Sequence, residues 1–207
     1  MKRVAIFFIS MALIFASTDS FSQGAPKPIV GVKGGLNLAN IGGDETDNSL
    51  KMAFHGGAYS EVFFNYFLMM QAEFLLSYQG HGGFDPDIAG SSSLSLWYLN
   101  IPVMARYNIG YNLNVHAGIQ MGLLLSGKSK IADPTAGSLT FDVKDQFKAL
   151  DWGIPIGVGY DFGDRDVSVM ARYIIPINNI SSDAFFKRTN SVFQVSVGLK
   201  IATLDNL

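Results

Sequence analysis

Residues 97–108 read WYLNIPVMARYN, and residues 113–126 read LNVHAGIQMGLLLS. In both stretches apolar side chains occupy every second position and alternate with mostly polar or small ones. Successive side chains of a β-strand point to opposite faces, so this period of two predicts strands with one apolar face. In the first stretch that face comprises Trp97, Leu99, Ile101, Val103, Ala105 and Tyr107. We therefore expect an all-β fold.

The same alternation recurs along the chain and predicts eight strands. It is clear in residues 150–162 and 167–177, and weaker in four further stretches: Ile29 to Ile41, Met52 to Phe64, Phe67 to Gln79, and Ser191 to Ile201. Strands of a dozen or so residues exceed the usual five or six of soluble sheets and suffice for the roughly 9–11 tilted residues that cross a bilayer. The sequence predicts a transmembrane antiparallel β-barrel of about eight strands in an up-and-down meander.

The links between these strands alternate strictly between short and long. Short links fall at residues 65–66, 109–112 and 163–166, and long links at residues 42–51, 80–93, 127–147 and 179–190. Outer-membrane barrels have short periplasmic turns and longer external loops, often with aromatic girdles at the membrane boundaries. The residues expected in the girdles are Phe63, Phe64, Tyr66, Phe67, Tyr107, Tyr111, Tyr160 and Phe162 beside the short turns, with Trp97 and Trp152 at the outer rim.

The N-terminus reads as a cleaved secretory signal peptide at residues 1–22. It has a basic start at Lys2 and Arg3, an apolar run from Val4 to Ala16, and a small-residue cleavage site before Gln23. A membrane anchor would need roughly 18 or more apolar residues in a row, and polar residues 17–19 break this run. Residues 23–207 would then form the outer-membrane barrel domain.

Charge and cysteine content narrow the classes of protein further. Removing the signal peptide takes away two of the 15 basic residues and one of the 17 acidic residues, which leaves a net charge of −3. This near-balance argues against a nucleic-acid partner, which would require a basic patch. The chain has no cysteine, so an exported protein would have neither a disulfide nor the cysteine of a bacterial lipid anchor.

Three short motifs follow one another along the chain: GVKGGLN at residues 31–37, YLNIP at 98–102 and GVGYDF at 157–162. Taken in order, they resemble the PorT-like outer-membrane β-barrel family of Bacteroidetes. The resemblance spans nearly all of the mature chain and implies an eight-stranded outer-membrane barrel. It implies no catalytic residues, because the family shares none. One departure is that many such barrels end at an aromatic residue in the last strand, whereas this chain continues through Ala202 to Leu207.

Several charged residues fall on the predicted inward faces. An eight-stranded barrel is just wide enough for its side chains to fill it, and an unpaired buried charge costs several kcal/mol. We therefore expect a structural network of salt bridges and hydrogen bonds, in which Glu61 and Glu73 are both candidate partners of Arg106. The alternative is a charged pore. The residues of this predicted lumen network are Lys33, Glu61, Glu73, Arg106, Asp151, Arg172 and Lys200.

No catalytic, cofactor or metal site is predicted. His55, His81 and His116 are too far apart in the predicted barrel to share a metal ion. His116 with a nearby serine or aspartate could build a lipid-modifying hydrolase, but no G-x-S-x-G motif is present. The acidic loop at residues 44–48 offers oxygen ligands to calcium without the spacing of an EF-hand. We expect a protein that is not an enzyme and has no cofactor.

Two functional hypotheses remain. In the first, the barrel is a structural or interaction scaffold whose external loops bind a partner at the cell surface. In the second, the lumen serves as a narrow pore, a transporter or an enzyme site. Recognition in such scaffolds usually lies on loops, and the longest, residues 127–147, mixes charges of both signs. The expected partners are outer-membrane lipid, the barrel-assembly machinery, periplasmic chaperones and an unidentified surface ligand, with the barrel itself monomeric.

Overall fold

The computed structural model describes residues 27–44, 50–85, 90–133, 137–163 and 165–203. The predicted signal peptide and Glu45, Asp47 and Asn48 of the acidic loop lie outside these residues. The described strands are β1 (Ile29–Gly43), β2 (Lys51–Phe63), β3 (Leu68–Asp85), β4 (Gly90–Asn108), β5 (Leu113–Asp133), β6 (Gly137–Asp142), β7 (Leu150–Phe162), β8 (Val167–Pro176) and β9 (Arg188–Thr203). A single 3₁₀ turn, η1 (Lys144–Gln146), lies between β6 and β7.

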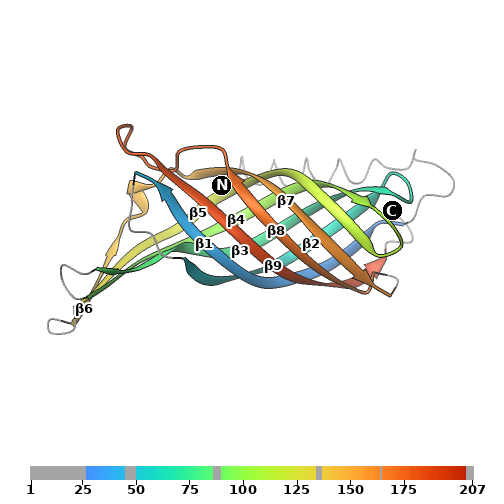
Figure 1. Cartoon of the computed structure of the whole chain (residues 1–207), viewed down its shortest axis with the longest axis horizontal. Helices are drawn as coiled ribbons and strands as arrows, with labels where there is room; N and C mark the ends of the chain where they lie inside the picture. Colours follow the sequence, from blue (N-terminus) through green and yellow to red (C-terminus); the bar gives the residue numbers. More distant parts are fainter. Residues whose placement is uncertain (1–26, 45–49, 86–89, 134–136, 164, 204–207) are drawn as a thin grey trace, which may run out of the picture.

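Eight of these strands close into a barrel, as the sequence predicts. Every neighbouring pair is antiparallel, and the ring runs β1, β2, β3, β4, β5, β7, β8, β9 and back to β1 (Figure 1). Closure pairs the backbone groups of every strand, which is what a spanning sheet needs in a medium without water. Among the described residues, no helix has the length and apolar character needed to cross a membrane.

The two faces of the wall follow the predicted alternation. On the outside, Val103 is 37% exposed and Ile119 is 57% exposed, and large apolar side chains continue around the ring. On the inside, Met104, Arg106 and Gln120 are buried. A soluble barrel would bury its apolar face and expose its polar one, so the outer surface is that of a protein solvated by lipid.

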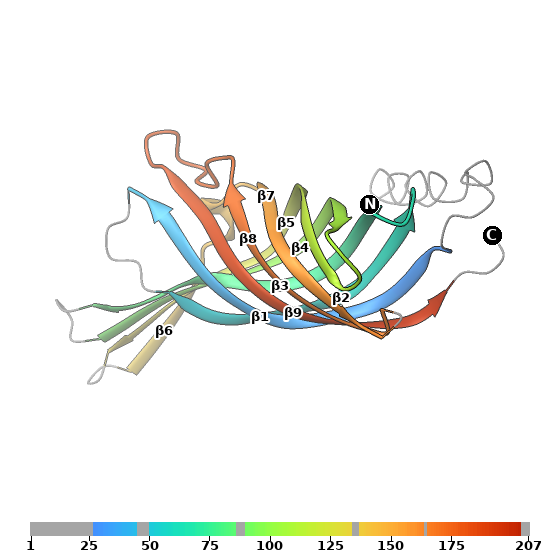
Figure 2. The ribbon, with the colours of Figure 1, turned by 45° about the vertical axis from the view of Figure 1, so that its right-hand side comes forward.

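The sheet continues well beyond the closed ring at one end. There β3 runs on to Asp85, β4 begins at Gly90, β5 runs on to Asp133, and β6 pairs with β5 alone. Figure 2 shows this four-stranded extension projecting past the barrel. The predicted loops at residues 80–93 and 127–147 are therefore mostly strand. Their sequence shows no apolar alternation, because serine and lysine take the place of the apolar residues, while cross-strand hydrogen bonds still stabilise the backbone.

One β-bulge separates the extension from the membrane-spanning part of β5. Trp97 pairs with Ser126 and Tyr98 pairs with Leu124, so Leu125 is the extra residue. A bulge changes which side chains point to which face. Up to Leu125 the odd-numbered residues of β5 face outward, whereas beyond it the even-numbered residues, such as Ser126 and Lys128, take that face.

One predicted girdle residue is placed differently. Phe63 is 4% exposed and points into the barrel, where it packs with Ile29, Tyr59 and Met69. The parity of β2 explains this, because its odd-numbered residues face inward. The other aromatic residues beside the short turns are exposed: Phe64, Tyr66, Phe67, Tyr107, Tyr111, Tyr160 and Phe162.

Close approach of β4 and β5 requires a glycine at position 118. A Cβ atom there would lie 2.1 Å from the carbonyl oxygen of Val103 and 2.6 Å from Cα of Met104. We expect Gly118→Ala to lower the free energy of unfolding by about 1–3 kcal/mol, the usual cost of overpacking. Urea titration would measure this loss, with the folded fraction at each urea concentration read from the heat-modifiable band on a gel. Gly110→Ala is the matched control, since a Cβ atom there meets nothing within 4 Å; equal stability of the two variants would contradict the close approach.

Candidate functional site

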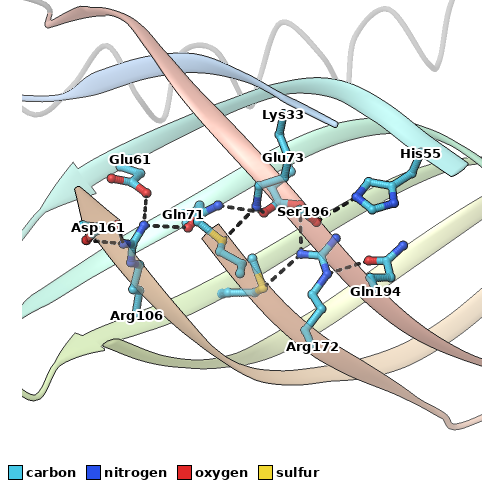
Figure 3. Close-up of polar contacts among 12 residues, drawn as sticks. Lys33, His55, Glu61, Gln71, Glu73, Arg106, Asp161, Arg172, Gln194 and Ser196 are labelled. Atoms are coloured by element: carbon cyan, nitrogen blue, oxygen red, sulfur yellow. Dashed lines mark hydrogen bonds and ion pairs between the residues drawn. The ribbon is translucent and has the colours of Figure 1, made fainter. Parts of the chain in front are cut away.

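The lumen holds a first ion cluster that joins opposite walls of the barrel. Lys33 of β1 and Arg172 of β8 both donate hydrogen bonds to the carboxylate of Glu73 on β3 (Figure 3). Arg172 Nη1 lies 2.9 Å from Oε2 of Glu73, and Gln71 Nε2 lies 2.7 Å from Oε1. Arg172 also donates through Nε to Gln194 at 2.6 Å. A single carboxylate thus holds two cations.

A second ion cluster lies nearer the short turns. Arg106 of β4 donates through Nη1 to Glu61 of β2 and through Nη2 to both carboxylate oxygens of Asp161 on β7. Glu73 is not a partner of Arg106. Arg106 is in register with Met69, so the neighbouring inward residue Gln71 meets it, at 3.5 Å, and Glu73 lies one inward position further along. Gln71 therefore connects the two clusters.

These charges are out of contact with solvent. The six residues Lys33, Glu61, Glu73, Arg106, Asp161 and Arg172 are between 0% and 4% exposed, and they comprise three cations and three anions. Taking an ion out of water costs several kcal/mol, and the cost is recovered only where opposite charges and hydrogen bonds compensate it. Matching of charge is therefore a condition for the barrel to fold around this lumen.

Two residues of the predicted network lie elsewhere. Asp151, the second residue of β7, accepts a hydrogen bond from Asn190 Nδ2 at 2.8 Å, near the end of the barrel that carries the extension. Lys200, near the end of β9, pairs with Asp166 at 2.6 Å at the opposite end. Both occupy inward-facing positions in the alternation of their strands, but they lie at strand ends, away from the ion clusters. Asp161 belongs to the second cluster and was missed, although the alternation of residues 150–162 places it on the same face as Asp151.

A chain of neutral polar groups continues from the ion clusters. His55 lies 2.7 Å from Asn37 Oδ1 through Nδ1 and 2.8 Å from Ser196 Oγ through Nε2. A serine, a histidine and an amide in this order have the geometry of a hydrolase triad. All three are buried inside the lumen. His116 is also buried, and among the described residues neither of its ring nitrogens has a hydrogen-bond partner.

Apolar layers close both ends of the polar lumen. At the end next to the extension a cluster is formed by Ile41, Leu94, Leu96, Tyr98, Leu124, Val143, Phe147 and Ile180. Backbone hydrogen bonds fasten this cover, from Lys148 N to Ile180 O and from Ser182 N to Gln146 O. At the other end Ile29, Tyr59, Phe63 and Met69 pack together. Between these two layers the described charged side chains of the ion clusters are buried.

Among the described residues, no group of three or more histidine or acidic side chains could hold a metal ion. His55 and His116 point into the lumen, and His81 lies on β3 beyond the ring. In the acidic loop, Asp44 accepts a hydrogen bond from the backbone of Lys187 at 2.7 Å.

Comparison with solved structures finds similar folds at low sequence identity. Ail, the attachment invasion locus protein of Yersinia pestis, has a TM-score of 0.53 and 11% identity, and the match covers 85% of this chain and 99% of Ail. Ail in complex with the heparin analogue sucrose octasulfate gives a TM-score of 0.52, with 10% identity and coverage of 84% and 99%. Neisserial surface protein A gives 0.49, with 12% identity and coverage of 86% and 100%.

A search of curated proteins finds no matching sequence. A family model does match, over residues 21–182, and its description is outer membrane protein beta-barrel domain. The matched region includes seven of the eight strands of the ring and the extension. The closed ring, its lipid-type outer face and this match agree, and the chain belongs to the outer membrane protein beta-barrel domain family as an outer-membrane β-barrel protein.

Proposed function

We propose that this protein is a non-enzymatic scaffold of the outer membrane whose lumen is a structural plug and whose external extension is the surface for interaction. The observation that carries this proposal is the burial of the lumen charges, which are at most 4% exposed. A conducting pore needs a continuous path along which an ion can pass the charged groups, surrounded by water or by groups that bind and release it. Here the three cations and three anions of the two clusters compensate one another, and apolar layers cover both ends.

The proposed topology places the short turns in the periplasm and the extension outside the cell. It is supported by the contrast in length between the two ends, since outer-membrane barrels keep short turns on the periplasmic side. In this proposal residues 1–22 are a signal peptide that is removed on export. Periplasmic chaperones and the barrel-assembly machinery then deliver the chain to the membrane as a monomer. The motifs at residues 31–37, 98–102 and 157–162 support a PorT-like protein of Bacteroidetes.

An enzymatic role for the lumen is disfavoured by access. Ser196 is 2% exposed, and its hydroxyl and the His55 ring lie inside the barrel wall among Asn37, Gln194 and Ser77. A nucleophile must come within about 3–3.5 Å of a substrate atom, and the burial of Ser196 keeps its hydroxyl out of reach of a substrate in solution. This polar chain therefore stabilises the wall.

Planar bilayer recording tests the plug directly. We expect purified, folded protein to insert without producing a stable single-channel conductance, because no hydrated path runs through the lumen. The control is the same preparation after heat unfolding, which reports the leak caused by detergent and denatured chain. Reproducible channels from the folded form, absent from that control, would show that the lumen is a pore.

A further inference from the structure

The outer face of the extension carries a cleft that is separate from the lumen. Its volume is about 350 Å³, within the range of small-molecule sites. Four strands contribute to it, from β3 to β6. The lining residues are Tyr78, Ser95, Trp97, Ser126, Lys128, Lys130 and Thr140.

Aromatic rings form the part of the cleft nearest the membrane. The ring centroids of Tyr78 and Trp97 are 5.1 Å apart, and Phe54 of β2 packs against both at 5.7 Å and 5.6 Å. This contact fixes the two cleft rings in place before any ligand arrives. A rigid aromatic surface with hydroxyl groups beside it suits the apolar face and the polar edge of a sugar ring.

Positive charge lies around the aromatic rings. Lys51 Nζ is 4.6 Å from the centroid of Tyr78 and donates hydrogen bonds to Leu94 O at 2.7 Å and Ser95 Oγ at 2.8 Å. Lys128 and Lys130 are exposed and, within the described part of the chain, form no ion pair. Among the described residues, Asp142 lies opposite Lys128 on β6 and accepts a hydrogen bond from the backbone of Lys144. The three lysines favour an anionic ligand.

The cleft lies where the lipid-type surface ends. On β3 the outward residue before Tyr78 is Leu76, which is 51% exposed, and on β5 the residue before Ser126 is the bulge residue Leu125. A molecule bound there would contact apolar wall on one side and lysines on the other. This order matches a lipid whose chains lie in the membrane and whose headgroup is anionic.

We propose that this cleft binds the phosphorylated sugar headgroup of a glycolipid in the outer leaflet of the outer membrane. Trp97 and Tyr78 contact the sugar, Lys128 and Lys130 pair with phosphate, and the acyl chains lie along Leu76 and Leu125. This assignment rests on the orientation proposed above, in which the extension is outside the cell. It does not depend on whether the lumen conducts.

The test uses the folded full-length barrel in phosphatidylethanolamine nanodiscs that contain diphosphoryl lipid A, phosphatidylglycerol or neither. Native mass spectrometry measures the lipid retained on the protein. Lysines near an anionic membrane surface each contribute enough that K128Q/K130Q should lower lipid A retention about thirtyfold. K148Q is the matched control, since Lys148 is exposed at the same end of the barrel and is not part of the cleft. Heat-modifiable migration confirms that every variant is folded.

A second variant and a soluble competitor identify what is recognised. W97L should weaken retention of lipid A and leave that of phosphatidylglycerol unchanged, because only the former carries a sugar to contact the indole. Equal retention of lipid A by wild type and K128Q/K130Q would overturn the proposal. So would displacement of lipid A by low concentrations of inorganic pyrophosphate, which would assign the cleft to a soluble anion. Bilayer conductance of the same wild-type sample tests the plug independently, so either proposal can fail alone.

Discussion

Glu73→Ala should lower the free energy of unfolding of the barrel by about 3–5 kcal/mol, the range expected when one partner of a buried ion pair is removed. Glu73 of β3 compensates both Lys33 of β1 and Arg172 of β8, and all three side chains are buried. Alanine would leave two cations close together with no carboxylate between them. Urea titration, followed by the gel shift between folded and heat-unfolded protein, would measure the loss.

Two companion variants separate the ion pair from simple loss of packing. Glu61→Ala removes one of the two carboxylates of Arg106 and leaves Asp161 in place, so its cost should be smaller. Adding Lys33→Met to Glu73→Ala should recover part of the loss, since one uncompensated charge disappears and the two residues are in direct contact. If Glu61→Ala were as costly as Glu73→Ala and Lys33→Met recovered nothing, the charge-matching account of the lumen would be wrong.

A cation on the middle of the lipid-facing wall should block assembly. Ile119 is central in the membrane-spanning part of β5 and points outward, where arginine costs about 2–4 kcal/mol near the bilayer midplane. We expect Ile119→Arg to reduce the folded, heat-modifiable fraction in the outer membrane sharply. Gln120→Arg should be milder because that side chain points into the lumen.

Leu139 of β6 provides the control for position. It is 65% exposed, more than Ile119, and it is also an aliphatic residue on a strand. It belongs to the extension, which we propose lies beyond the membrane, so Leu139→Arg should assemble like the wild type. A defect of the same size in Leu139→Arg would mean that the extension is inserted in lipid, and the boundary drawn at the aromatic cleft would have to move.

The closed ring could be predicted because every side chain that faces lipid has to be apolar. Residues 97–108 and 113–125 meet this requirement at every second position, so the period of two is visible in a single sequence. The inward parity of Glu61, Glu73 and Arg106 could be read in the same way. The sequence does not predict which carboxylate pairs with Arg106. That pairing depends on how far each strand is shifted along its neighbour, and the sequence of one strand alone does not determine this shift.

The extension escaped prediction for a different reason. Outside the membrane neither face of a strand needs to be apolar, so Ser91 to Ser95 and Ser126 to Lys130 have no strong contrast between alternate positions. The bulge at Leu125 adds a change of parity that the run of three leucines conceals. Simple alternation along residues 113–126 places Ser126 on the same face as His116 and Gln120, whereas in the structure it lines the outer cleft. The cleft could therefore be found only from the paired strands.

The bulge at Leu125 also gives β5 a place where its length can change without a change of its faces. Loss of that one residue would leave Leu124 opposite Tyr98 and Ser126 opposite Trp97, so the strand would alternate regularly and the side chains beyond would keep their faces. The pairing of β5 with β4 and β7 below the bulge could also stay as it is. Related barrels should accordingly differ in length here more often than within the spanning strands, where a change of one residue reverses every side chain that follows.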